Sequence, residues 1–474
     1  MTKSLTSIRF GTDGWRAVIA QDFTFANVER VAQAYADYLS EQAETEGAML
    51  VVVGYDRRFL SEKFAARACE VLVGNGFRIA LFPHDCPTPL ISWAVKVLQA
   101  AGGVVITASH NPYDFNGFKI KAPWGGSATP DTTAQVDSLV DRTAIKKSDV
   151  VAQGQELLGA AVESYRQQIE SYIDLERLRT ARGAVIVDPM HGVGGRWVEG
   201  FLSGGTLNVQ TIRGDRDPLF GGVNPEPIDR NLSALKQRVL DSQGLLGLAT
   251  DGDADRVGAV DEHGTTLTMH DVVPLLLLHL ARNRKMIGGV VRTFSQSILT
   301  KRIATKLGLK LYETPIGFKY IADLMLNEDI LIGAEESGGI GVKGHIPERD
   351  GILNSLLFLE AVITAGKPPS EMLRDLHKEF GEFYFGRRDL HMEVERGKEL
   401  VDRLANQPPA MFGAEEVLDV KTLDGTKLEF TDESWLLFRQ SGTEPVLRIY
   451  SEATSVAKMN RLLDDGVALA AAIS

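Results

Sequence analysis

The sequence predicts an α/β protein, on the strength of three observations. Short apolar, β-branched runs recur along the chain, each is followed by a segment with helical periodicity, and the composition is that of an ordinary globular protein, with 44% hydrophobic and 24% charged residues. Apolar strands that alternate with amphipathic helices are typical of mostly parallel sheets covered on both faces. The predicted strands span 49–53, 103–107, 184–187, 245–248, 289–291 and 330–332, and the predicted helices span 24–43, 61–75, 159–180 and 295–307.

The length of 474 residues suits about three domains, and changes of composition suggest where they meet. A polar stretch at 141–156 follows the first group of elements, and 264–271 resembles a turn that leads into a new apolar helix. From about Gly381 charged, alternating segments replace the α/β pattern. We therefore expect α/β domains at 1–150, 151–266 and 267–385, followed by a smaller C-terminal α+β domain at 386–474.

Charge and hydropathy restrict the partners and the location. The formal net charge of −12 argues against a general polyanion-binding surface, so no nucleic-acid partner is expected and an anionic ligand must be held by local clusters of Arg, Lys and backbone N–H groups. Cys69 and Cys86 form no C-x-x-C pair, which suits a reducing cytosol. The N-terminus has no apolar signal region, and the strongest apolar run, 272–280, is too short to span a bilayer. We expect a cytoplasmic protein with no membrane partner.

The first candidate loop is TASHNPYDFNGFK, which directly follows the apolar strand GGVVIT. It places Ser109 where the carboxyl ends of strands present ligands in α/β sheets. A hydroxyl is a weak nucleophile, and a nearby His or Lys, here His110 or Lys119, is the usual means of activating it. The alternative is a purely structural turn, with a break at Asn111-Pro112 and a hairpin turn at Asn116-Gly117.

The second candidate loop, DGDADR, follows the segment LLGLAT and carries Asp251, Asp253 and Asp255. Carboxylates held about 4 Å apart repel one another by roughly 4 kcal/mol per pair at an effective dielectric constant of about 20. Such a cluster favours a bound cation. Hard carboxylate oxygens at this spacing suit Mg²⁺, which keeps open positions for water and a phosphate oxygen.

Two other interpretations of the DGDADR loop disagree with its sequence. An EF-hand fits the three aspartates and Glu262, but Arg256 stands where the EF-hand turn requires Gly, and both flanks have the pattern of strands rather than helices. A phosphohydrolase of the haloacid dehalogenase kind fits Asp251-Gly-Asp253, but that family expects a hydroxyl residue at position 255, which is Asp.

Two further loops follow predicted strands in the second half of the chain. The loop GAEESGG, after the strand ILI, offers two carboxylates and a hydroxyl that can bond a ring of sugar hydroxyls, although capping of a helix start is the alternative. The loop RQSGTEP, between WLLF and VLRIY, combines an Arg, two hydroxyls and a glycine-opened run of N–H groups. That set forms a cradle for a phosphate, and a plain hairpin connection is its alternative.

Taken together and in this order, the four loops resemble those of the α-D-phosphohexomutases, the phosphoglucomutase and phosphomannomutase superfamily, over essentially the whole chain. The resemblance implies three similar α/β domains with mixed sheets plus the C-terminal domain, arranged around a central cleft. It implies a phosphoserine at Ser109 and one Mg²⁺ per chain, held by Ser109 and the three aspartates, with Arg256 beside them. FGTDGWR and TPIGFK resemble two more loops of that family. The substrate-binding residues that the resemblance implies are Arg16, Thr314, Gly317, Lys319, Glu335, Ser337, His345, Arg349, Arg439, Ser441, Gly442 and Thr443.

The implied activity is that of an isomerase, a phosphoglucomutase that interconverts glucose 1-phosphate and glucose 6-phosphate. Phosphorylated Ser109 gives its phosphoryl group to the sugar phosphate, and glucose 1,6-bisphosphate forms as intermediate and activator. His110 or Lys119 is the expected base. Bifunctional phosphomannomutases often end the sugar loop in G-E-x-S-G-H, whereas this chain has Gly339 there and Ala334 before Glu335. We therefore favour the glucose esters.

Several alternatives stay open at this point. They are a phosphomannomutase or bifunctional phosphohexomutase, a glucose 1,6-bisphosphate synthase, and a metal-dependent sugar phosphatase or an inactive sugar-phosphate-binding scaffold. Glucose and mannose differ only at C2, so one epimeric hydroxyl must carry the discrimination between them. The expected partners are small sugar phosphates, and the expected state is a monomer or a dimer.

Overall fold

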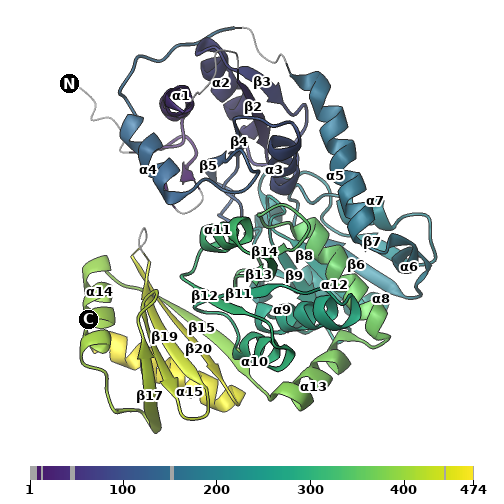
Figure 1. Cartoon of the computed structure of the whole chain (residues 1–474), viewed down its shortest axis with the longest axis vertical. Coiled ribbons are helices and arrows are strands. Elements are labelled where there is room, and N and C mark those ends of the chain that lie inside the picture. The colour runs from purple at the N-terminus through teal and green to yellow at the C-terminus, as the bar shows by residue number, and fades with distance from the viewer. Residues whose placement is uncertain (1–7, 12–13, 43–48, 150–153, 442–444, 473–474) are drawn as a thin grey trace. The chain divides into compact units, whose positions relative to one another are not determined.

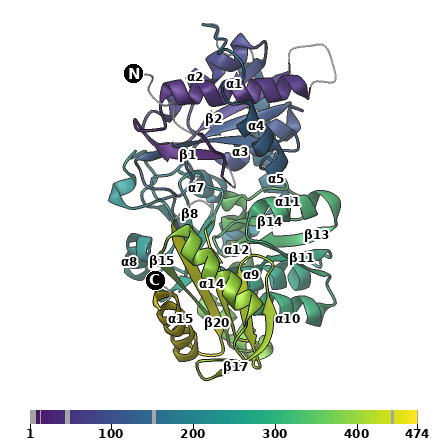
Figure 2. The ribbon, with the colours of Figure 1, turned by 90° about the vertical axis from the view of Figure 1, so that its left-hand side faces the viewer.

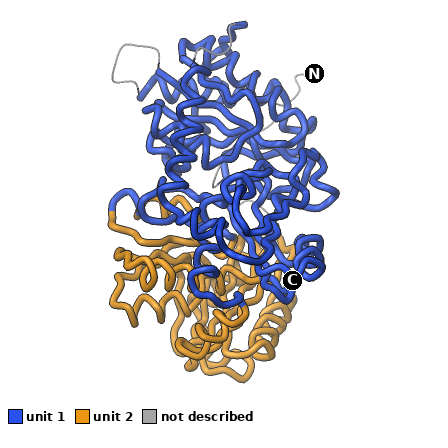
Figure 3. The backbone as a smooth tube through the Cα atoms, turned by 90° about the vertical axis from the view of Figure 1, so that its right-hand side faces the viewer, with its two compact units in different colours: residues 1–266, 325–327, 338–369 blue, residues 267–324, 328–337, 370–474 orange. Residues whose placement is uncertain are grey.

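A computed structural model of the chain describes residues 8–11, 14–42, 49–149, 154–441 and 445–472. It contains four β-sheets, three of them built from alternating strands and helices (Figure 1). The chain divides into two compact units, one of residues 1–266, 325–327 and 338–369, the other of residues 267–324, 328–337 and 370–474 (Figure 3). No helix in the described part of the chain combines the length and apolar character that crossing a membrane requires.

The first sheet has the order β1-β5-β4-β2-β3. Strand β2 pairs in parallel with β3 and β4, whereas β5 runs antiparallel to β4 and β1, so the sheet is mixed. Helices α1 and α2 pack together beside it (Figure 2), and their buried residues form one core with those of the strands. The bounds are β1 Trp15–Val18, β2 Leu50–Tyr55, β3 Arg78–Leu81, β4 Gly102–Ile106, β5 Phe115–Lys121, α1 Phe25–Glu41, α2 Ser61–Gly74, α3 Thr88–Val97 and α4 Pro130–Leu139.

The second sheet repeats this plan with the order β10-β9-β8-β6-β7. Strand β6 is parallel to β7 and β8, and β9 is antiparallel to β8. Because β8 and β9 flank the DGDADR loop, the loop lies between strands, and the EF-hand alternative is wrong. The bounds are β6 Ala184–Asp188, β7 Asn208–Thr211, β8 Leu246–Thr250, β9 Val257–Val260, β10 Thr266–Leu267, α5 Leu158–Tyr172, α6 Leu175–Thr180, α7 Trp197–Leu202 and α8 Ser233–Ser242.

The third sheet has the order β12-β11-β13-β14, with β11 parallel to β12 and β13. Helix α12 is buried along nearly its whole length. Asp350 caps its N-terminus, because its carboxylate accepts hydrogen bonds from the N–H groups of Ile352 and Leu353. The bounds are β11 Gly289–Thr293, β12 Leu311–Thr314, β13 Ile330–Ala334, β14 Ile340–Val342, α9 Met269–Leu278, α10 Ile298–Leu307, α11 Phe318–Asn327, α12 Gly351–Ala365 and α13 Pro369–Phe380.

The fourth sheet is antiparallel, with the order β15-β20-β19-β18-β17-β16. Helices α14 and α15 share one hydrophobic core with it (Figure 2). Three α/β sheets of one mixed plan and a C-terminal α+β domain confirm the predicted fold class. The bounds are β15 Tyr384–His391, β16 Met411–Phe412, β17 Glu415–Lys421, β18 Thr426–Phe430, β19 Trp435–Gln440, β20 Val446–Ala453, α14 Val394–Asn406 and α15 Val456–Ala471.

Equivalent strands carry three of the four candidate loops. The strand in third place in the order of each α/β sheet, β4, β8 or β13, ends shortly before the loop with Ser109, the three aspartates or Glu335. The hairpin turn considered at Asn116-Gly117 is wrong, because both residues lie inside β5 and pair with β1. The buried Asn116 amide donates to Ser61 Oγ, so a tertiary contact overrides the local turn preference.

Candidate active site

Ser109 lies at the carboxyl end of β4, in the loop that leads to β5. The residues of β4 are all buried, so the polar residues that follow are presented at the edge of the sheet. The Ser109 backbone is left-handed, with φ of 52°, and its N–H donates to Thr107 Oγ1 at 2.9 Å. Non-glycine residues rarely adopt this conformation, and they keep it where the surrounding structure enforces it.

A buried arginine that sequence reasoning missed enforces the shape of this loop. Arg58 pairs with Asp56 at 3.1 Å, and Asp56 also accepts the hydroxyl of Thr107 at 2.6 Å. Both partners of the pair are essentially inaccessible to water. The Arg58 guanidinium donates hydrogen bonds of 2.6–3.0 Å to four carbonyl oxygens of the loop, those of Ser109, Asn111, Pro112 and Phe115.

The three aspartates after β8 face this loop and are fully buried. One carboxylate oxygen of each lies within 4.8 Å of the others. Ser109 Oγ donates to Asp251 Oδ2 at 2.8 Å. The approach requires Gly252, because a Cβ at that position would stand 2.4 Å from the carbonyl oxygen of Ser109. Two loops that were identified separately in the sequence are therefore in direct contact.

Three cations surround the aspartates. Lys119 Nζ lies 2.8 and 3.3 Å from carboxylate oxygens of two of them. Arg349 Nη2 lies 2.9 Å from an oxygen of Asp255, and Arg256 Nε lies 4.0 Å from an oxygen of Asp251. The arrangement provides positive charge on several sides of a position where a phosphate can approach the serine.

The aspartates fit a divalent cation. Asp253 Oδ1 and Asp255 Oδ1 are buried and accept no hydrogen bond from the described residues. Burial and the charges of the other two aspartates raise the pKa of Asp251 well above its ordinary value. The pKa of Asp253 is lowered although burial opposes the shift, because Lys119 and Thr88 stabilise its charged form. Orphaned carboxylate oxygens and mutual repulsion are both relieved by a hard cation such as Mg²⁺.

His110 stands beside the serine, with Nδ1 3.3 Å from Ser109 Oγ. Loss of water around its ring, reinforced by the positive charges of Arg256 and Arg16, holds the pKa of His110 well below its ordinary value. The ring is therefore neutral near pH 7 and able to accept a proton. Arg16 reaches the same loop, because its Nη1 donates to Asn111 Oδ1 at 2.6 Å.

Glu348 is a second residue that sequence reasoning missed. Its carboxylate lies 2.6 Å from Lys121 Nζ and 3.3 Å from Arg349 Nε, and it accepts the hydroxyl of Ser127 at 2.7 Å. Burial opposes ionisation, but Lys121 and Arg349 lower the pKa of Glu348 to about 2. Glu348 therefore helps to hold Arg349 against Asp255. Through Lys121 it also connects β5, the strand that carries Lys119, to the same group of ion pairs.

His345, expected among the substrate-binding residues, lies within a stack of aromatic rings. Its side chain is 1% exposed, and its Nε2 lies 3.0 Å from Asp350 Oδ2. Its ring stacks on Trp93 with a centroid distance of 5.5 Å. Tyr165 donates to the same Asp350 oxygen at 2.9 Å. These contacts fix the segment between β14 and α12.

The remaining predicted residues belong to the second unit. Thr314 ends β12, and Gly317 and Lys319 follow in the loop and in the first turn of α11. Glu335 is buried at the end of β13, and Ser337 is half-buried in the loop that follows it. In that loop Glu336 Oε2 accepts the hydroxyl of Ser295 at 2.8 Å.

Arg439 ends β19 on the side of the RQSGTEP loop, and Ser441 is buried, its N–H bonded to the carbonyl oxygen of Val446 at 2.9 Å. Gly442 and Thr443 lie outside the described residues. Asp424 was not predicted from the sequence. Its carboxylate accepts one hydrogen bond of 2.9 Å from Arg439 Nε and another of 2.8 Å from the N–H of Ile316. The TPIGFK loop and the arginine of the RQSGTEP loop are therefore joined by one carboxylate.

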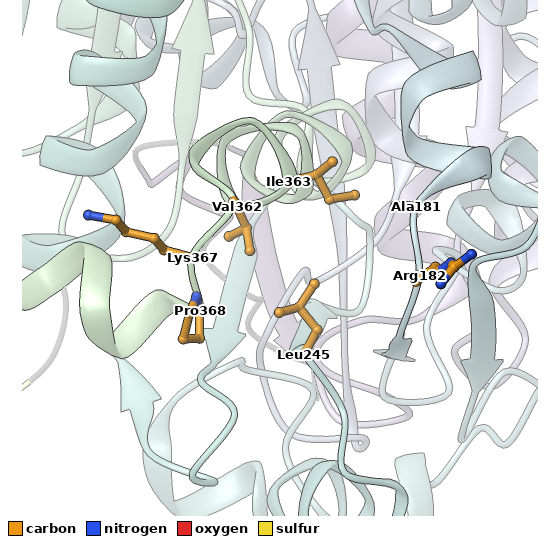
Figure 4. Close-up of a pocket in the computed structure, with 8 residues that line it drawn as sticks. Ala181, Arg182, Leu245, Val362, Ile363, Lys367 and Pro368 are labelled. Carbon is orange, nitrogen blue, oxygen red and sulfur yellow. The ribbon is translucent and has the colours of Figure 1, made fainter.

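A pocket of about 320 Å³ lies elsewhere on the first unit. Its wall is mostly apolar, and Figure 4 shows Leu245, Val362 and Pro368 around the hollow. None of the residues predicted from the sequence lines it. The residues that line it are Ala181, Arg182, Leu245, Val362, Ile363, Gly366, Lys367 and Pro368.

A serine hydroxyl bonded to a buried acidic cluster, with cations on several sides, is suited to phosphoryl transfer, in which positioning and charge neutralisation supply most of the catalysis. The fold and the site thus define a phosphotransferase built on repeated α/β domains. Residues 7–146, 163–264 and 270–380 match the alpha/beta/alpha domains I, II and III of the phosphoglucomutase/phosphomannomutase family, and residues 392–469 match its C-terminal domain.

Similar proteins align with nearly the whole chain. A phosphoglucomutase/phosphomannomutase of Thermococcus kodakarensis is 30% identical over 97% of this chain and 98% of its own. A phosphoglucosamine/phosphogalactosamine mutase of Sulfurisphaera tokodaii is 28% identical over 96% of this chain and 97% of its own. A crystal structure from Thermus thermophilus, provisionally described as a phosphomannomutase, has 37% identity and a TM-score of 0.85 over 98% of this chain and 99% of that one.

The chain belongs to the α-D-phosphohexomutase superfamily, the phosphoglucomutase and phosphomannomutase family, as its sequence predicted. It is therefore an enzyme of the isomerase class that moves a phosphoryl group within a sugar phosphate. Relatives carry names for glucose, mannose and hexosamine substrates, so the sugar is a separate question.

Proposed function

We propose that this enzyme interconverts glucose 1-phosphate and glucose 6-phosphate through a phosphoserine at Ser109 and a glucose 1,6-bisphosphate intermediate. The observation that carries the proposal is the 2.8 Å hydrogen bond from Ser109 Oγ to Asp251, inside a buried acidic cluster surrounded by cations. The preference for glucose rests on the sugar loop, in which Gly339 replaces a His that is frequent in bifunctional phosphomannomutases.

The proposed reaction begins with phosphorylated Ser109. A hydroxyl oxygen of the bound sugar phosphate forms a bond to phosphorus, and the bond from phosphorus to Ser109 Oγ breaks. The proton of the attacking hydroxyl passes to a base, and the base returns it to the leaving Ser109 Oγ. Ser109 thus ends as a hydroxyl that can donate to Asp251, as it does in the structure. The neutral ring of His110, 3.3 Å from Ser109 Oγ, supports its assignment as that base. Lys119 would then serve to balance charge, because it already contacts two carboxylates.

Asp251, Asp253, Asp255 and the serine oxygen would hold one Mg²⁺. When bound, the ion supplies positive charge to the phosphoryl oxygens as negative charge develops on them. Arg256 and Arg349 flank the same position and would stabilise the same charge. After the first transfer the bisphosphate turns end over end, so that the phosphate first held by the Arg439 loop is returned to Ser109.

A coupled assay tests the proposal. Glucose 1-phosphate, mannose 1-phosphate and glucosamine 1-phosphate are compared, each with its matching bisphosphate and with or without Mg²⁺. We expect the glucose ester to turn over fastest and Ser109→Ala to lose essentially all turnover. Faster turnover of another ester would replace the proposed sugar and leave the reaction class intact. Release of inorganic phosphate without isomerisation would favour a phosphatase, and accumulation of free bisphosphate would favour a bisphosphate synthase.

A further inference from the structure

The turn between β17 and β18 contributes a carboxylate to the ligand-binding side of the second unit. Asp424 Oδ1 accepts Arg439 Nε at 2.9 Å, and Asp424 Oδ2 accepts the backbone N–H of Ile316 at 2.8 Å. The side chains of the pair are 22% and 16% exposed, so the contact is partly shielded from solvent. One residue therefore bonds both the predicted phosphate-binding arginine and the predicted sugar-orienting loop.

The turn is packed closely against the strand that carries Arg439. Gly425 has φ of 89°, and a Cβ there would stand 2.3 Å from the carbonyl oxygen of Phe438 and 3.1 Å from the Cα of Arg439. Only a glycine allows the chain to pass at this distance. The Asp424 carboxylate is therefore held next to the guanidinium by the backbone as well as by its own hydrogen bonds.

The sugar-orienting loop is anchored at the same point. The side chain of Ile316 packs against a cluster formed by Phe294, Trp435, Leu437 and Tyr450, while its N–H is bonded to Asp424. A shift of the Asp424 carboxylate would therefore move the loop and the arginine together.

A carboxylate beside an arginine that binds phosphate has an electrostatic cost, because it repels the incoming anion. Asp424 also raises the pKa of Arg439, although burial opposes that shift. The bond to Asp424 is made by Nε rather than by the terminal Nη groups, and it fixes the plane of the guanidinium. An arginine that is already fixed loses less conformational entropy when it binds a phosphate. This smaller entropy cost offsets the repulsion between Asp424 and the phosphate.

We propose that Asp424 is a positioning residue that couples the phosphate-binding arginine to the sugar-orienting loop, so that the two ends of a hexose phosphate are recognised as one unit. The inference rests on the proposed function, because it assigns the ligand of these loops as a hexose phosphate. Asp424 acts through Arg439 and Ile316 and does not itself touch the substrate.

The test compares the wild type, Asp424→Ala and the matched control Asp419→Ala. Asp419 is exposed on β17 of the same hairpin and accepts a hydrogen bond from the N–H of its neighbour Val420. Calorimetry measures binding of glucose 1-phosphate, and the coupled assay measures kcat and KM. We expect Asp424→Ala to raise Kd and KM about tenfold, the loss typical of one hydrogen bond to a charged group, with a smaller change in kcat. The control should match the wild type.

A second arm places Asp424→Ala in an Arg439→Met background. If Asp424 acts partly through the arginine, its removal in that background should raise Kd by about threefold or less, because only the bond to the N–H of Ile316 is then lost. A tenfold loss in that background would overturn the proposal. A merely structural role would lower kcat, through loss of folded enzyme, and leave KM unchanged, which would also overturn it. Unchanged or tighter binding by Asp424→Ala would mean that repulsion outweighs positioning, and would overturn it as well.

Asp424→Asn is the test variant if the alanine variant does not fold. It keeps the side-chain volume and one acceptor, and we expect Kd to rise between the wild-type and alanine values; a wild-type Kd would overturn the proposal. Failure of the proposed function has a different signature. In that case the wild type and the Asp419→Ala control would turn over no hexose phosphate, while calorimetry would still report whether Asp424 contributes to ligand binding.

Discussion

Lys427 presents a buried positive charge whose energetic effect can be worked out from its surroundings. It is 1% exposed on β18, and its Nζ lies 4.4 Å from the ring centroid of Phe294 and 4.6 Å from that of Trp435. Burial, followed by the charge of Arg292, lowers the pKa of Lys427 from its ordinary 10.5 to about 7. Three other charged groups also act on it, Glu313, Glu429 and Lys421.

The perturbation is Lys427→Met, which keeps the length of the side chain and removes the charge. Between pH 7 and the unfolded pKa of 10.5, the unfolded chain binds a proton at Lys427 that the folded protein does not. The contribution of Lys427 to stability therefore rises with pH in this window, and below about pH 7 the full cost of burying the ammonium applies. Half of the folded molecules still carry the Lys427 proton near pH 7. At 1.36 kcal/mol per pKa unit, the gain in free energy of unfolding from Lys427→Met should therefore shrink by about 2 kcal/mol between about pH 7 and pH 9.

Urea unfolding followed by tryptophan fluorescence measures this difference, since Trp435 contacts Lys427. Other titrating groups cancel in the difference between the two proteins at each pH. Lys306→Met is the control, because Lys306 is exposed, pairs with Glu379 at 2.8 Å and is not one of the charged groups that act on Lys427. An equal effect of Lys427→Met at both pH values would refute the reasoning, since Lys427 would then keep one charge state throughout.

Three further predictions concern the first unit. Arg58→Met should destabilise the protein by about 3–5 kcal/mol, because it leaves Asp56 buried without its cation; urea unfolding measures the loss, and wild-type stability would contradict it. Glu348→Gln should destabilise by a similar amount, about 3–5 kcal/mol, since Lys121 is 0% exposed and loses its counter-charge; a smaller loss than from an exposed Glu→Gln change would count against this. Asp253→Asn should weaken Mg²⁺ binding in calorimetry by at least about tenfold, because a charged oxygen donor is lost, and chelation should abolish wild-type turnover; full turnover in excess chelator would exclude a metal requirement.

The sequence was informative where chemistry is concentrated in a short segment. Ser109 and the three aspartates each follow an apolar strand, and a strand end in an α/β sheet is where ligands bind. Like charges so close together also indicate a cation without any structure. The same local logic correctly identified the α/β architecture, whereas the mixed character of the sheets followed only from the family resemblance.

The supporting residues were missed because their partners are distant in sequence. Arg58 bonds carbonyl groups more than 50 residues away, and Asp424 bonds the N–H of Ile316, 108 residues earlier. No spacing or periodicity records such contacts. Helix α12 was not predicted because it is buried on nearly all sides and lacks an amphipathic pattern. At Asn116-Gly117 the local sequence favours a turn, but the two residues pair with β1 inside a strand.

The most direct test of the central claim is to locate the phosphate on the enzyme. The protein is incubated with glucose 1,6-bisphosphate labelled in its phosphates, digested and mapped by mass spectrometry, and a second sample is chased with unlabelled glucose 1-phosphate. We expect label on Ser109 alone and its transfer to the sugar during the chase. Label on another residue, or label on Ser109 that the chase releases only as inorganic phosphate, would contradict it.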